Sequence, residues 1–60
     1  MKKYFVVYFF AKKINLYKFH CLAINWQEAV NILNSQKVDF EYKIAGVGNG
    51  IGELDFNKFE

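Results

Sequence analysis

The 60-residue sequence contains no proline, one cysteine and one histidine. A lone cysteine cannot form an internal disulfide bond, so packing alone must stabilise the fold, as is usual in a reducing cytoplasm. Threonine is also absent and serine occurs once, which leaves few nucleophiles for catalysis. His20 and Cys21 are adjacent on a predicted strand and point to opposite faces, so they cannot form a catalytic pair or a shared metal site. We expect Cys21 in the core, His20 on the surface, and a protein that is not an enzyme and holds no metal or cofactor.

Arginine is absent as well, so all eight cationic residues are lysines, and the formal net charge is +2. Half of the chain is Lys, Asn, Ile, Phe or Tyr, residues with A/T-rich codons, which indicates an A/T-rich genome. The apolar run from Tyr4 to Ala11 is too short for the ~20 residues that span a bilayer. It also lacks the small-x-small pattern of a signal-peptide cleavage site. We therefore expect a cytoplasmic protein that does not enter a membrane.

Hydrophobic residues are abundant, at 53% of the chain, and 20% of the chain is aromatic. The run from Tyr4 to Ala11 is apolar at every position, which is typical of a central strand. The alternating run from Asn15 to Ile24 predicts a second strand. The hairpin register that aligns the apolar sets pairs Ala11 with Asn15, Phe9 with Tyr17, Val7 with Phe19 and Phe5 with Cys21.

The apolar spacing becomes helical after the second strand. Trp26, Ala29, Val30 and Leu33 follow the i, i+3, i+4, i+7 stripe of an amphipathic helix. Asn25 is a favourable N-cap, and a glutamate three residues later completes a variant of the capping box. We expect about three helical turns, fraying over residues 34–36, with the stripe packed across the sheet.

A third strand is predicted from Val38 to Ala45, where apolar and charged residues alternate. The segment 48–50, Gly-Asn-Gly, then predicts a tight hairpin turn. This second hairpin would pair Ile44 with Leu54, Tyr42 with Phe56 and Lys43 with Asp55. The expected fold is α+β in ββαββ order: an antiparallel sheet of about four strands, with one helix packed on one face and the first strand near the centre. Residues 1–60 form one small domain.

The second face of the first hairpin carries more large apolar groups than a wetted surface should, and exposed patches of this kind mark interfaces. Its residues are Tyr4, Val6, Tyr8, Phe10, Leu16, Lys18, His20 and Leu22. Three interpretations stay open: a homodimer surface, a docking surface for another protein, and a platform for single-stranded nucleic acid. In the last, the aromatic rings stack on bases while Lys18 and the lysines at 2, 3, 12 and 13 contact phosphates.

A secondary acidic and loop patch comprises Asn49, Glu41, Glu53 and Asp55, with Asp39 beside it. Charges on an edge hairpin usually prevent edge-to-edge aggregation, and the alternative is an acidic docking patch. The glycine run 46–52 lacks the Lys-Ser/Thr of a P-loop, which favours a flexible loop over a nucleotide site.

These observations predict a non-catalytic interaction protein, an inhibitor or adaptor of the kind that phages and mobile elements encode. It would bind a larger macromolecular partner, and would do so as a homodimer. The alternative function is binding of single-stranded nucleic acid through the aromatic and lysine face, with an affinity that falls steeply as salt is added.

Overall fold

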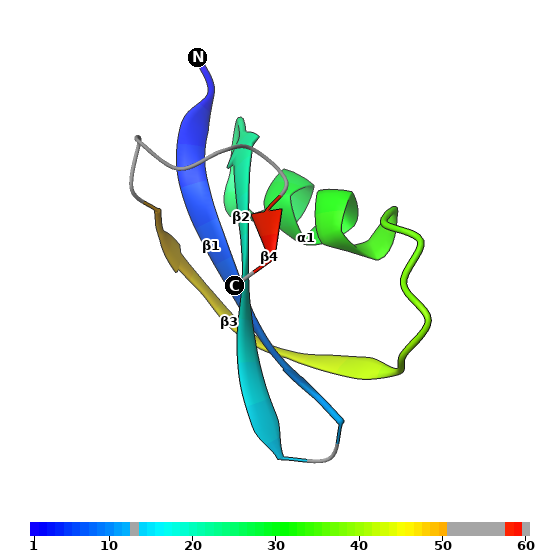
Figure 1. Cartoon of the computed structure of the whole chain (residues 1–60). Coiled ribbons are helices and arrows are strands. Elements are labelled where there is room, and N and C mark those ends of the chain that lie inside the picture. Colours follow the sequence, from blue (N-terminus) through cyan, green and yellow to red (C-terminus); the bar gives the residue numbers. More distant parts are fainter. Residues whose placement is uncertain (13, 51–57, 60) are drawn as a thin grey trace.

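A computed structural model of the chain describes residues 1–12, 14–50 and 58–59. The fold is α+β: one helix lies against one face of an antiparallel sheet (Figure 1). The strands follow the order β3-β1-β2-β4, so the first hairpin forms the centre of the sheet. The elements are β1 (Lys3–Ala11), β2 (Asn15–Ala23), α1 (Trp26–Asn34), β3 (Tyr42–Asn49) and the two-residue β4 (Lys58–Phe59).

The register of the first hairpin is confirmed. β1 and β2 pair Ala11 with Asn15, and the alignment continues without interruption to Lys3 and Ala23. In the turn between these strands, Lys12 has a φ of 52°, in the left-handed region. The predicted central position of the first strand is also confirmed, because β1 has β2 on one side and β3 on the other.

The core lies between the sheet and α1, on the side that we call the helix-side face. Val7 and Phe19 are directly opposite each other on the two central strands, and both are fully buried. Ala29 and Leu33 of α1 complete this layer. Next to this layer, four other aromatic rings have their centroids within 6.3 Å of the centroid of the Phe9 ring. They belong to Tyr17, Phe40, Tyr42 and Phe59.

The predicted helix start is confirmed at Asn25. Its side-chain Oδ1 accepts a hydrogen bond of 2.8 Å from the backbone N–H of Glu28, which satisfies one of the free donors of the first turn. The Glu28 carboxylate accepts from the backbone N–H of Ile24, one residue before the cap, at 3.2 Å. The helix ends at Ser35, whose hydroxyl donates to the carbonyl of Ile32. Trp26 was predicted to lie on the buried stripe, but 55% of it is exposed, so that prediction was wrong.

The third strand lies further along the chain than predicted. β3 begins at Tyr42 and includes most of the glycine run, so the predicted turn at 48–50 is wrong. A β-bulge interrupts its pairing with β1: Tyr8 pairs with Gly46, but Phe9 pairs with Ile44. The extra residue between them changes the alternation, so that residues on either side of it share a face. Ile44 and Val47 therefore both pack on the core.

The predicted ββαββ order is not supported. Among the described residues, three full strands build the sheet, and β4 is a two-residue segment that pairs with β2, at the edge opposite to β3. A second hairpin would instead place the third and fourth strands side by side. The predicted pairs that involve Leu54, Asp55 and Phe56 lie outside the described residues.

Candidate interaction surface

The far face of the sheet, turned away from α1, contains all eight residues predicted for the aromatic face. Their exposure changes along the strands. Val6 and His20, directly paired at the middle of the hairpin, are both buried, and Tyr4, Tyr8 and Leu22 are half-buried. Phe10, Leu16 and Lys18, nearer to the turn, are exposed. The surface open to a partner is therefore the end of this face next to the turn.

Tyr8 is half-buried, and its ring lies over Gly48 of β3. It pairs with Gly46, and a Cβ placed on Gly48 would lie 3.3 Å from Cε2 of the tyrosine. On the far face, the ring thus lies where a side chain at Gly48 would be. This packing is the "aromatic rescue" by which a cross-strand ring compensates for a glycine in an edge strand. It accounts for Gly48, which the sequence pattern assigned to a loop.

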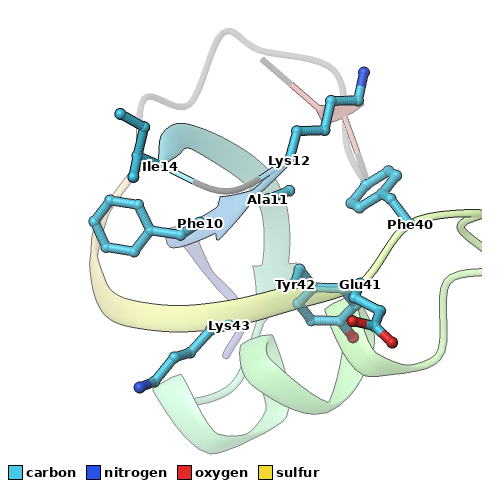
Figure 2. Close-up of a pocket in the computed structure, with 8 residues that line it drawn as sticks. All are labelled: Phe10, Ala11, Lys12, Ile14, Phe40, Glu41, Tyr42 and Lys43. Carbon is cyan, nitrogen blue, oxygen red and sulfur yellow. The ribbon is translucent and has the colours of Figure 1, made fainter.

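The exposed apolar residues next to the turn form what we call the hairpin-end patch: Phe10, Ile14 and Leu16. Phe10 and Leu16 are directly paired across the hairpin, with exposed fractions of 41% and 54%. Ile14, in the turn, is 86% exposed, and Figure 2 shows its side chain on the same side of the hairpin as the Phe10 ring. Paired aromatic and aliphatic side chains at this exposure present one apolar surface to the solvent.

Lysines surround the hairpin-end patch. Lys43 of β3 pairs with Phe10, and Lys18 of β2 pairs with Tyr8. Lys12 and Lys43 also line an open hollow between the hairpin end and the start of β3, together with Phe40, Glu41 and Tyr42 (Figure 2). The charged residues that line the hollow are two lysines and one glutamate, Glu41, so the net charge of the hollow is positive.

The predicted acidic and loop patch is only partly described. Asp39 and Glu41 are exposed but precede β3, so they do not share a strand face as predicted. Asn49 is exposed at the end of β3. Glu53 and Asp55 lie outside the described residues.

Cys21 and His20 have no geometry for joint chemistry. Cys21 is in the core as predicted, and burial, reinforced by the charge of Glu28, raises the pKa of its thiol. His20 was predicted on the surface but is buried, so that prediction was wrong. Among the described residues, no three His, Cys, Asp or Glu side chains gather in a way that could hold a metal ion. The helix in this part of the chain is too short to cross a membrane.

Two exposed residues with a potential role in binding were missed by the sequence analysis. Ile14 lies in a turn between charged and polar residues, and it becomes part of a contiguous apolar patch only because the folded hairpin places it beside Phe10 and Leu16. Trp26 fits the apolar stripe of α1, but it begins the helix at the margin of the sheet, beside the edge strand β3. Helical spacing predicts which residues form the apolar stripe, but it does not predict which of them the sheet covers at each end of the helix.

Comparisons of the chain with protein-family models, with curated proteins and with solved structures give no match in any of the three.

Proposed function

We propose that this chain is a non-catalytic interaction protein, an inhibitor or adaptor that binds a larger macromolecular partner and that self-associates through the hairpin-end patch. The observation that carries the proposal is the direct pairing of Phe10 with Leu16, both exposed, beside the more exposed Ile14. Burying these side chains removes apolar surface from water, at about 25 cal/mol per Å².

A two-fold dimer suits this patch. Two copies related by a two-fold axis can place the Phe10 ring of one protomer on Leu16 of its partner and the reverse, so that one small surface is used twice. A chain of this size buries a limited core by itself, and association adds to it. The lysines beside the patch stay at the rim, where long side chains keep their charged ends in water.

Sedimentation across a range of protein concentrations tests this proposal, with Leu16→Asp as the disrupting variant. Ile24→Asp is the matched control, because Ile24 is 53% exposed, close to the 54% of Leu16, and directly follows the end of β2 that is remote from the hairpin turn. We expect the wild type and Ile24→Asp to form dimers and Leu16→Asp to stay monomeric, with unchanged circular dichroism for all three. A wild type that is monomeric at every concentration would contradict self-association.

Single-stranded nucleic acid is the second candidate ligand, favoured by the position of Lys18 and Lys43 beside exposed or half-buried rings. Aromatic rings stack on bases and lysines neutralise phosphates, so the two kinds of side chain complement each other on one face. Titration with a fluorescent oligothymidine at several salt concentrations separates the candidates. Contacts from Lys12, Lys18 and Lys43 would give a slope of log K against log salt of about −2, whereas apolar protein contacts would change little.

A further inference from the structure

The outer edge of β3 carries hydrogen-bonding groups that no strand satisfies among the described residues. The sheet order β3-β1-β2-β4 leaves β3 at an edge along its eight residues. The backbone N–H of Gly50 donates to the carbonyl of Tyr4 at 2.9 Å, toward β1. Because successive residues of a strand alternate in direction, Val47 and Asn49 direct their N–H and C=O groups away from β1.

The protection of this edge against pairing is confined, among the described residues, to the first half of β3. Natural edge strands are protected by lysines, prolines, covering segments or β-bulges that prevent another strand from adding to them. After the bulge, β3 continues as Gly46, Val47, Gly48 and Asn49, without a charged residue or proline. Lys43 lies before the bulge, at the start of the strand. Within the described part of the chain, the segment 46–49 therefore has no feature that prevents pairing with another extended chain.

A groove runs beside this edge, between β3 and α1. Trp26 and Val30 line it from the helix, and Ile44 and Val47 line it from the strand. With a volume of about 510 Å³, it can hold several side chains. None of the residues that line it has an ionisable side chain. A charged side chain in this groove would lose hydration without gaining a counter-charge, so the charge pattern selects an uncharged segment.

We propose that the β3 edge binds an extended, uncharged peptide segment of a protein partner as an added strand. Only another extended backbone has donors and acceptors at the spacing of Val47 and Asn49, and alternate side chains of that strand would enter the groove beside Trp26. The proposal rests on the proposed function, because it specifies the partner of a chain that acts by binding proteins. Self-association uses the hairpin-end patch, which leaves the β3 edge free for the partner.

The matched variants Asn49→Pro and Asn49→Ala test the edge. Proline removes the outward N–H and is tolerated at such a position of an edge strand, whereas alanine removes only the exposed side chain. The probe is an acetylated and amidated peptide of about seven residues that alternates threonine with valine. We expect it to shift the amide signals of Val47 and Asn49 and the indole signal of Trp26 in NMR spectra. Asn49→Pro should weaken binding about tenfold or more, and Asn49→Ala by no more than about twofold.

Two further peptides make the result specific. A version with lysine in place of valine should not bind. Among valine peptides that are N-methylated at alternate residues, one of the two possible phases should lose binding and the other should keep it, because only one set of amides faces β3. Absence of binding, signal shifts confined to other surfaces, or equal loss in both methylated phases would overturn the proposal. Self-association is read separately by sedimentation, so its failure and a failure of the β3 edge are distinguishable.

Discussion

The ring of Tyr8 on β1 lies over Gly48 of β3, where a Cβ would be 3.3 Å from Cε2 of the ring. The glycine therefore has a packing role, although its sequence context is that of a turn. Because Gly48 has no side chain, the tyrosine covers this part of β3 on the far face.

Substituting Gly46 of β3 and Gly50, which directly follows this strand, should have opposite effects on stability. A Cβ at Gly46 meets no atom within 4 Å, and no described glycine has a positive φ, so Gly46→Ala should stabilise the protein by about 0.5 kcal/mol by restricting the unfolded chain. A Cβ at Gly50 would lie 3.2 Å from three backbone atoms of Phe5, which cannot yield as a side chain can. Gly50→Ala should therefore cost about 1–3 kcal/mol. Urea denaturation with a common m-value measures both, and equal effects would contradict this account of the packing.

The N-cap at Asn25 should contribute measurably to stability. Asn25→Ala removes the acceptor that binds the N–H of Glu28 and should cost about 1 kcal/mol, or roughly 4–8 °C in the melting temperature of a small domain. Asn25→Asp is the control, because its carboxylate keeps an acceptor at the positive end of the helix. If alanine and aspartate melt at the same temperature, the capping bond has no energetic role.

One hydrogen bond joins the end of α1 to the start of β3: the hydroxyl of Tyr42 donates to Oδ1 of Asn34 at 2.7 Å. We expect a double-mutant cycle with Tyr42→Phe and Asn34→Ala to give a coupling energy of about 0.5–1 kcal/mol, at the lower end because the bond is exposed. Phenylalanine keeps the edge-to-face contact with the Phe9 ring, so the cycle isolates the hydroxyl. Additive single-variant effects would show that the two elements are not coupled through this bond.

Cys21 should make stability fall at alkaline pH. Burial holds the pKa of the thiol above its ordinary value of 9.0, so the folded state keeps a proton that the unfolded state releases. The contribution is fully present below pH 9.0 and is lost as the pH rises through the higher folded value. Urea midpoints of wild type and Cys21→Ala, measured from pH 7 upward, should diverge above that point. Parallel pH profiles for the two proteins would contradict the effect of burial.

The first hairpin could be predicted from sequence because its information is local. An apolar run and an alternating run separated by a short turn have few registers that align their apolar residues on one face, and pairing Phe9 with Tyr17 selects the one observed. The N-cap was equally accessible, since Asn25 and the helix that it starts are neighbours in sequence. The capping residues are three positions apart in the sequence, and the paired strands of the hairpin directly follow each other. Both features can therefore be predicted from a short stretch of sequence.

The third strand could not be predicted correctly because its conformation is set at a distance. Gly46 and Gly48 are extended because they pair with β1, and the Tyr8 ring of that strand lies 3.3 Å from the position of a Cβ on Gly48. The bulge also changes the alternation, so Ile44 and Val47 share a face although their spacing is not that of a regular strand. Neither cause is visible in the segment itself.

Burial on the far face depends on position as well as residue type. His20 and Leu16 belong to the same alternating set, yet the histidine is buried at the middle of the sheet and the leucine is exposed near its end. Sequence alternation identified the face but not the gradient along it. The candidate surface is therefore smaller than predicted, and it gains Ile14, which belongs to no strand.

The place of β1 between β2 and β3 also has a consequence for synthesis on the ribosome. β1 can pair with β2 as soon as the short turn closes, a local event on the microsecond scale of about 1–10 μs. The other edge of β1 stays unpaired until β3 has been synthesised, and β3 follows the whole of α1 in the sequence. During that interval the nascent chain presents the unpaired edge of an aromatic strand, so a pause in translation before residue 42 would favour aggregation or chaperone binding over productive folding.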